Sequence, residues 1–445
     1  MIGALVLVSV LQQAPKAFVD SSAAAAPAEE GVHFHAALEV GALALSAGTD
    51  ATGVDGFGFA FPRLGVRGGE EFEFELGAPL RLRLLDQEPL QAQPDYGGRL
   101  RREDWDERSD FAQVLRSLRI GRDDGRFQLR AGDFSSYSLG AGWLVNRYNN
   151  RISPDYHPAG ANFTAYLGPT RVELFASDVL AARLFAGEVR LDLGRVLSNT
   201  ETAFDRFLLS VDVAHDFGRA GGTSPALSAA SVGLQAGLVR NEKLQLWVQG
   251  AAGARADTLA ESVPDYGATV GLVVAGKPRE NVEISGRLEG RRQGGLFRFG
   301  AFGAGYELSR FSGVGLSELP LSQEQLPATF SGYGELVATV SQGRAEDLEL
   351  LASASGEYFV TTGRVDADAV LQLQLPGGRT MAELRAILTD LTGKPRYSVA
   401  AEVRHRFVPA LYGIFMGGTE HFPQANGSLR HGFMAGLGVG VDFER

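Results

Sequence analysis

A period of two, with charged residues on one parity and apolar residues on the other, recurs along most of this chain. In the clearest copy, residues 71–84, the odd positions hold Glu71, Glu73, Glu75, Arg81 and Arg83, and the even positions hold Phe72, Phe74, Leu76, Leu80, Leu82 and Leu84. Successive side chains of a β-strand point to opposite faces of its sheet, so this segment predicts a strand with one charged and one apolar face. Its length suits a tilted strand that crosses a bilayer with roughly 9 to 11 residues.

The same division returns in residues 188–193, 281–291, 347–353, 364–375 and 399–407. Any one of these segments also fits a soluble antiparallel sheet with one face in water. About twenty such candidates, separated by turn signals every ten to fifteen residues, would leave a soluble sheet with long unpaired edges. No linker rich in Pro, Gly or Ser divides the chain into halves. We therefore predict an all-β fold, a single large antiparallel transmembrane β-barrel, because closure removes the edges and satisfies every backbone group in lipid.

The connections between these strands predict which end of the barrel faces which side of the membrane. Short turns are expected at residues 123–125, 343–345, 376–378 and 392–394, where turn-forming residues gather. Long external loops are expected near residues 86–110, 135–160, 218–229, 254–265, 309–329 and 421–431. The alternation of long and short connections fails around residues 276–296, so we predict about 18 strands, with 16 and 20 open.

The carboxyl-terminal segment reads as a closing strand. Its apolar parity comprises Phe433, Ala435, Leu437, Val439, Val441 and Phe443. From about residue 31 onward the chain resembles the bacterial outer-membrane β-barrel (porin-like) superfamily, whose last strand ends in an aromatic residue recognised by the barrel-insertion machinery. Phe443 matches that residue, although Glu444 and Arg445 follow it. The resemblance implies a location in the bacterial outer membrane, with its lipid and the insertion machinery as partners.

The amino-terminal residues predict export. Residues 2–11 form a short apolar run, and small residues at 23–27 suit signal-peptidase cleavage. We therefore divide the chain into residues 1–30, a signal peptide with a flexible segment, and residues 31–445, the barrel. The absence of Cys excludes disulfides and thiolate metal sites, and the net charge of -11 argues against a nucleic-acid partner.

The charged parity of the strands predicts the lining of the pore. The predicted lining residues are Glu71, Glu73, Glu75, Arg81, Arg83, Arg130, Arg190, Asp212, Glu283, Arg287, Asp347, Glu349, Asp366, Arg385, Arg404 and Arg406. Strong ion selectivity usually needs rings of one sign, so this mixed lining favours polar, hydrated cargo. A barrel of about 18 strands is wide enough for an aqueous passage.

Residues 135–160 combine aromatic rings with amides and guanidinium groups. Tyr137, Trp143, Arg147, Tyr148 and Tyr156 are the predicted saccharide-contact or constriction-loop residues. The alternative is an external loop packed on itself, with aromatic residues at the membrane rim.

Enzyme motifs are missing from the sequence. The seven His residues show no metal-binding spacing, and neither a nucleophile elbow nor a phosphate-binding loop occurs. Spacing alone does not exclude a barrel hydrolase built on an outward-facing Ser and His. We nevertheless expect no enzymatic activity, no cofactor and no metal site.

Three functions therefore remain open. The first is a pore for polar solutes, with saccharides as one class of cargo. The second is an exit barrel for a secreted polysaccharide, working with a periplasmic export partner. The third is a plugged barrel with a structural or adhesive role.

Overall fold

In the computed structural model of the chain, the described residues are 31–46, 54–69, 71–85, 100–123, 125–152, 156–181, 183–197, 207–218, 226–241, 243–256, 265–311, 319–342, 348–393, 395–423 and 429–444. The predicted signal peptide therefore lies outside the described residues.

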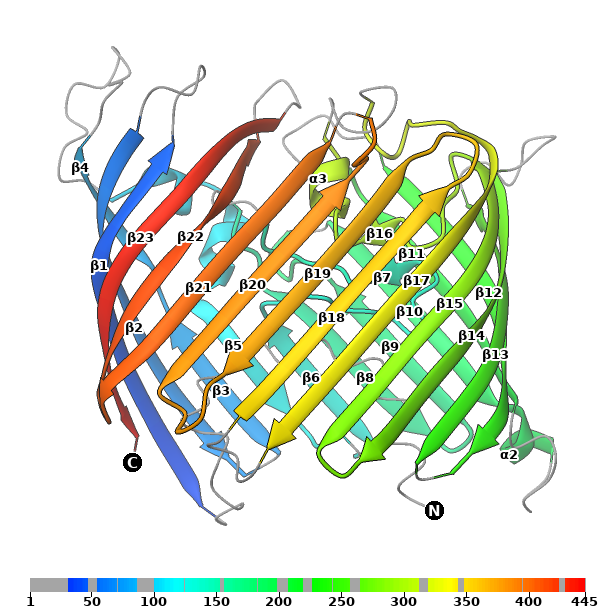
Figure 1. Cartoon of the computed structure of the whole chain (residues 1–445), viewed down its shortest axis with the longest axis horizontal. Helices are drawn as coiled ribbons and strands as arrows, with labels where there is room; N and C mark the ends of the chain where they lie inside the picture. Colours follow the sequence, from blue (N-terminus) through cyan, green and yellow to red (C-terminus); the bar gives the residue numbers. More distant parts are fainter. Residues whose placement is uncertain are drawn as a thin grey trace.

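The described chain forms one large antiparallel sheet that closes on itself (Figure 1). Its strands are β1 (Val32–Ser46), β2 (Val54–Gly68), β3 (Phe72–Gly77), β4 (Leu80–Leu85), β5 (Leu115–Ile120), β6 (Phe127–Gly132), β8 (Gly160–Leu167), β9 (Thr170–Ala176), β10 (Leu184–Asp192), β11 (Phe207–Asp216), β12 (Leu227–Arg240), β13 (Leu244–Arg255), β14 (Tyr266–Arg279), β15 (Val282–Gly295), β17 (Leu326–Gln342), β18 (Leu348–Phe359), β19 (Val365–Gln374), β20 (Thr380–Thr389), β21 (Arg396–Val408), β22 (Leu411–Pro423) and β23 (Leu429–Glu444). Consecutive strands pair along the chain, and β23 pairs with β1, with Val439 opposite Val40. The predicted closing strand is thereby confirmed.

Strands β3 and β4 are two halves of one barrel strand, since both pair with β2. The break falls at Ala78 and Pro79, and Pro has no N–H to give to the ladder. Counted in this way, the barrel has 20 strands, at the upper end of the predicted range.

The predicted division into an apolar and a charged face corresponds to the two sides of the wall. Leu64, Leu288 and Leu437 are 65%, 68% and 66% exposed, on the parity that points away from the lumen. Such a belt of exposed apolar side chains is stable only where lipid covers it. Among the described residues, no helix combines the length and hydropathy needed to cross a bilayer.

Successive connections alternate between the two ends of the barrel, and both described ends of the chain lie at the end where most connections are short turns (Figure 1). At that end the connection between β10 and β11 is longer and begins with the helix α2 (Leu193–Leu197). The six predicted long loops all fall at the opposite end. Two expectations were wrong in detail. The short connection after β20, predicted at residues 392–394 among the short turns, lies at the long-loop end. The loop predicted to begin at residue 309 begins at 296, directly after β15.

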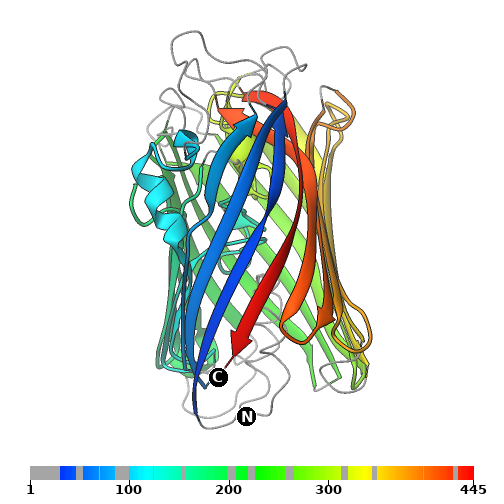
Figure 2. The ribbon, with the colours of Figure 1, turned by 90° about the vertical axis from the view of Figure 1, so that its left-hand side faces the viewer.

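The wall is unequal in height. Strands β5 and β6 have 6 residues each, whereas β17 has 17. Two 3-10 helices, η2 (Arg102–Asp104) and η3 (Arg108–Val114), lie at the upper end of the short strands (cyan in Figure 2). Short strands leave more chain between them, and part of that chain turns into the lumen.

Candidate functional site

Two loops fold back from the long-loop end into the barrel. We call the described residues of segments 133–159 and 296–325 the plug. Within it, β7 (Val145–Asn146) pairs in parallel with β16 (Phe302–Gly303). The main chain adds hydrogen bonds from Gly300 N to Trp143 O, 2.7 Å, and from Phe302 N to Leu144 O, 3.1 Å. The two loops therefore form one unit although more than a hundred residues separate them.

The plug has a hydrophobic core of its own. Its buried members include Tyr137, Leu139, Trp143, Leu144, Val145, Tyr148, Phe297, Phe299, Phe302 and Tyr306, packed against Phe175, Leu184 and Ala214 of the wall. Trp143 is fully buried, and its ring lies on Gly233 of β12, where any Cβ would come within 1.9 Å of the ring. The absence of a side chain at Gly233 thus allows the ring of Trp143 to pack directly on the backbone of the wall.

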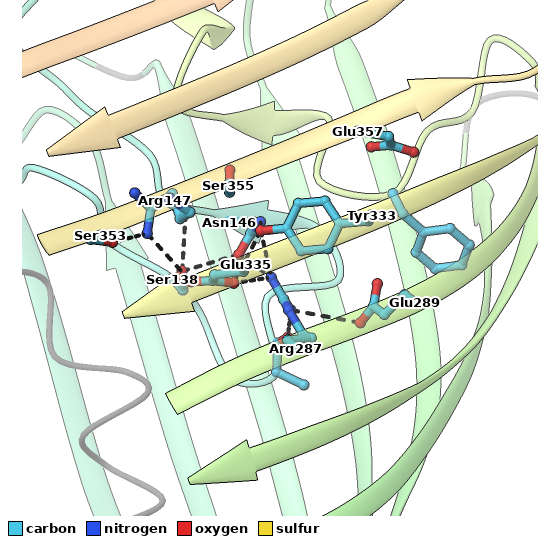
Figure 3. A network of polar contacts seen from close by, with 12 residues as sticks. Ser138, Asn146, Arg147, Arg287, Glu289, Tyr333, Glu335, Ser353, Ser355 and Glu357 are labelled. Carbon is cyan, nitrogen blue, oxygen red and sulfur yellow. Dashed lines mark hydrogen bonds and ion pairs between the residues drawn. The ribbon is translucent and has the colours of Figure 1, made fainter. Parts of the chain in front are cut away.

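Arg147 ties the plug to the tall side of the wall (Figure 3). Its Nε donates to Asp368 Oδ1 at 2.7 Å, and its Nη1 donates to Ser353 Oγ at 2.5 Å. Glu335 Oε1 lies 3.4 Å from the same Nη1. Burial alone would lower the pKa of Arg147, but Asp368 and Glu335 outweigh it and raise the pKa above its usual value. The contact is a buried ion pair, and Arg147 holds it with a positive φ of 58°.

Asn146 makes the neighbouring attachment (Figure 3). It accepts from Arg287 Nη2 at 2.7 Å and donates to the Tyr333 hydroxyl at 2.8 Å. Arg287 also donates to Glu335 at 2.8 Å and to the carbonyl of Ala141 at 2.5 Å. One plug segment therefore contacts strands β15, β17, β18 and β19 together.

The opposite side of the plug is held by tyrosine hydroxyls. Tyr137 donates to Glu173 of β9 at 2.9 Å, and Tyr306 donates to Asp216 of β11. Tyr148 donates to Glu307 within the plug at 2.5 Å. The plug thus bridges the lumen from β9 and β11 to β19.

Most residues predicted to line the pore lie on the inner face. These are Glu73, Glu75, Arg81, Arg83, Arg130, Arg190, Asp212, Glu283, Arg287, Glu349, Asp366, Arg385, Arg404 and Arg406. Glu71 lies in the turn between β2 and β3, and Asp347 lies outside the described residues. That they line an open passage stays a prediction.

Exposure of the inner face is uneven. The side chains of Arg287 and Glu335 on the wall and of Arg147 in the plug are 4–8% exposed, because the plug and the wall cover each other there. On the far side, the side chains of Glu402 and Arg385 are 39% and 23% exposed. Glu75, on β3, is 19% exposed. We call the part of the lumen next to β1–β5 and β20–β23 the passage, because solvent reaches these charged side chains there, whereas others such as Glu39 and Arg63 are buried.

The predicted saccharide-contact residues are all in the plug, but their rings are not open to solvent. Tyr137, Trp143, Tyr148 and Tyr156 are 0–6% exposed. Tyr137 stacks on Phe175 with ring centroids 4.3 Å apart, and Arg183 covers Tyr156 at 3.4 Å from its centroid. A sugar ring would find no free aromatic face among these four.

Sequence reasoning missed the second half of the plug. Residues 296–308 alternate apolar residues with Gly and Ala, so they imitate a strand. Only the positive φ of Gly295 and Gly300 ends that pattern in the folded chain. The cluster of Phe297, Phe299 and Phe302 was the available signal, because Phe297 and Phe299 share one parity and Phe302 lies on the other.

Asp110 and His157 join the plug to the helical segment beside it. Asp110 is buried, accepts from the backbone N–H of Glu107 at 2.9 Å, and is also bonded by the backbone N–H of His157. Burial raises the pKa of Asp110 to about 7, with Asp106 and Glu107 adding to the rise. Burial also lowers the pKa of His157 to about 4.

These two groups oppose each other as the pH changes. Because the pKa of Asp110 is raised, its contribution to stability is present at low pH and is lost as the pH rises from about 4 through about 7. Because the pKa of His157 is lowered, its contribution to stability is present above pH 6.5 and is lost as the pH falls towards about 4.

Asp110→Asn is therefore expected to prevent the destabilisation of the helical segment that ionised Asp110 causes above about pH 7. We expect amide hydrogen exchange of residues 102–114, corrected for the intrinsic rate, to slow at pH 8 in the variant relative to the parent protein. At pH 5 the two proteins should agree, because Asp110 is protonated there. Faster exchange of the variant at pH 8 would contradict the assignment.

One Ser–His contact bears on the enzyme alternative. His215 Nδ1 lies 2.7 Å from Ser228 Oγ across β11 and β12, on the lipid-facing side. A hydrolytic Ser–His pair also uses a third group that orients the imidazole. Among the described residues nothing hydrogen-bonds the other nitrogen of His215, and Phe217 packs against the ring at 4.3 Å. No group of three His, Asp or Glu side chains suited to a metal occurs in the described part of the chain.

No model of a protein family matches the sequence, and no curated protein matches it. Among solved structures, it is similar to OccK11 (OpdR) of Pseudomonas aeruginosa, with 10% identity, a TM-score of 0.34, and 93% of this chain and 96% of that chain covered. A BenF-like porin from Pseudomonas fluorescens Pf-5 has 10% identity and a TM-score of 0.34, with 94% and 100% covered. OccK2 (OpdF) of Pseudomonas aeruginosa in complex with glucuronate has 11% identity and a TM-score of 0.32, with 93% and 96% covered.

The architecture of this chain is established by its own strand pairing. A closed antiparallel barrel with a charged interior and an apolar outer belt satisfies its backbone groups internally and presents apolar side chains to lipid, as a membrane-spanning barrel must. The chain is a closed, 20-stranded antiparallel β-barrel of the transmembrane type.

Proposed function

We propose that this barrel is a channel that carries small polar solutes across the outer membrane, and that the plug narrows and gates it. The observation that carries the proposal is the uneven inner face. The plug covers the wall from β9 to β19, while charged side chains in the passage, such as Glu402 and Arg385, stay in contact with solvent.

The lining of the passage favours hydrated cargo of either sign. Arg404 lies 2.5 Å from Glu402 and 3.3 Å from Glu39, and Arg406 lies 2.6 Å from Asp442. Paired charges give a solute both donors and acceptors without a strong net field. Saccharides remain one candidate class, because their hydroxyl groups can bond to both the donors and the acceptors of the lining.

The other two functions make different demands on the plug. An exit barrel for a polysaccharide, working with a periplasmic export partner, would need the plug to leave the lumen as a unit. A structural or adhesive barrel would need it to stay. The hydrophobic core of the plug favours the structural barrel over the exit barrel, since departure of the plug from the lumen would expose Trp143 and Phe302, both fully buried.

Single-channel conductance of the refolded protein in a planar bilayer tests the proposal, with heat-modifiable gel mobility as the check that the barrel formed. We expect discrete conductance steps that scale with salt concentration, because the passage is aqueous. Current that falls on addition of oligosaccharide would support a saccharide cargo. A folded barrel that stays silent, even when the plug is released by mutation as described below, would refute the channel function.

A further inference from the structure

We propose that Arg116 and Arg151, together with Asp133 and Phe61, form a subsite in the passage that binds the oxyanion group of a permeating solute whose apolar part lies on Phe61. The inference rests on the proposed channel function and names the solute class for it. Arg151 belongs to the segment 135–160 that the sequence singled out, but Arg116, Asp133 and Phe61 were not among the predicted site residues.

Arg116 is aimed into the lumen by an irregularity in the wall. The register of β3 and β5 shifts there, since Glu75 pairs with Ser117 but Leu76 pairs with Leu115. Arg116 is thus the extra residue of a bulge, a device that redirects a side chain. Its guanidinium carbon lies 5.0 Å from the centroid of the Phe61 ring.

Arg116 differs from the arginines around it. Arg63, whose guanidinium carbon lies 5.7 Å from the Phe61 ring centroid, lies 2.8 Å from Glu39. Arg119, further along β5, lies 3.6 Å from Glu73. Within the described residues, Arg116 has neither an ion pair nor a hydrogen bond; its guanidinium group lies over Phe61, and its charge interacts at longer range with Asp133 and Glu75. An inward guanidinium that no carboxylate pairs with directly has N–H donors available to a ligand.

Arg151 brings a second cation from the plug. Its Nε donates to the carbonyl of Pro158 at 2.8 Å, while its Nη2 is buried without a hydrogen-bond partner. Burial lowers the pKa of Arg151 to about 10; Asp133 opposes this, and the charge of Arg116 adds to it. The charges of the three residues therefore act on one another, although no ion pair joins them.

Asp133 supplies an acceptor beside the two cations. It follows Gly132, the last residue of β6, and its Oδ1 is buried without a hydrogen-bond partner. Buried polar atoms are almost always paired, so Asp133 Oδ1 and Arg151 Nη2 point to a group that bridges them. With two guanidinium groups and one carboxylate, the cluster carries a net positive charge and favours an anion.

The ligand chemistry follows from these groups. Guanidinium forks bind carboxylate and phosphate oxygens through paired N–H donors. The Phe61 ring provides an apolar face next to them, and Asp133 accepts from a hydroxyl or amine on the solute. The subsite therefore suits a small organic acid with a ring or alkyl part.

Binding of 4-fluorophenylacetate to the detergent-solubilised barrel, followed by fluorine NMR, tests the subsite. We expect Arg116→Gln and Arg151→Gln to weaken binding about tenfold or more, the cost of one hydrogen bond to a charged group. The matched control is Arg119→Gln, which removes the same charge from the same strand but from an arginine paired with Glu73. The affinity of this control for the probe should stay within about twofold of that of the parent protein, because only unpaired guanidinium groups bind the probe.

Two further comparisons examine the two ends of the ligand. The neutral analogue 4-fluorophenylacetamide should bind about tenfold more weakly. Phe61→Ser should weaken 4-fluorophenylacetate but leave competition by acetate unchanged. Displacement of the probe by inorganic phosphate would support a subsite for oxyanions in general, and failure to displace it would support one for carboxylates.

Equal binding of the acid and the amide, or an equal loss in Arg116→Gln and Arg119→Gln, would overturn the subsite. Heat-modifiable mobility confirms that each variant forms its barrel. Because binding is measured without a current, a silent channel would refute conduction and leave this result standing.

Discussion

Arg147→Gln is expected to shift the barrel towards its open state and raise its mean single-channel current. Arg147 is 3% exposed and holds Asp368, Ser353 and Glu335 at once. Removing one partner of a buried ion pair costs about 3 kcal/mol or more, because the other charge stays buried and unpaired. A loss of that size in the plugged state changes the ratio of closed to open channels about a hundredfold. Planar-bilayer recording measures this directly.

The matched control for Arg147→Gln is Arg385→Gln. Arg385 also points into the lumen, but it pairs with Glu383 of its own strand at 3.1 Å and has no recorded contact with the plug. Its loss should alter the current only modestly. Asp368→Asn should reproduce the effect of Arg147→Gln, and the double variant should add little, since both changes break the same contact. Identical currents in Arg147→Gln and the parent protein would show that this contact does not hold the plug.

Gly233→Val is expected to expel Trp143 from its seat. Even a Cβ at this position would lie 1.9 Å from the ring, and the ring is enclosed by the plug core and by the backbone of β12. Loss of a buried Trp from a core costs about 3–5 kcal/mol. We expect the plug of this variant to be cut by protease within residues 133–159 and Trp143 fluorescence to move to longer wavelength. A background with Trp105 and Trp247 replaced by Phe isolates the signal, since the chain has 3 Trp.

Gly290→Val is the control for that substitution. Gly290 lies in β15 on the outer face, and an added Cβ there meets nothing within 4 Å. The same chemical change should therefore leave protease resistance and Trp143 fluorescence as they are. If Gly233→Val behaves like Gly290→Val, the plug is not seated on β12.

The sequence alone was sufficient to predict the barrel, because the alternation of charged and apolar side chains that specifies each strand is local. In residues 71–84, alternate side chains differ in hydropathy, and each strand face meets a single solvent, lipid or water, along its whole length. The same argument predicted the closing strand over residues 433–443, which β23 contains, and the set of long loops at one end. It also placed Arg287, Asp366 and Arg404 on the inner face, since parity decides the side of the wall.

Only the tertiary structure decided what fills the barrel. Asp368 lies 221 residues from Arg147 in the chain, and Gly233 lies far from Trp143, so no local pattern connects them. Residues 296–308 imitate a strand, and the aromatic residues of 135–160 resemble a sugar platform until the two loops bury each other's rings. Burial and pairing between distant segments depend on which surfaces meet in space. Local side-chain order sets the two faces of each strand, but it does not record which loop will cover them.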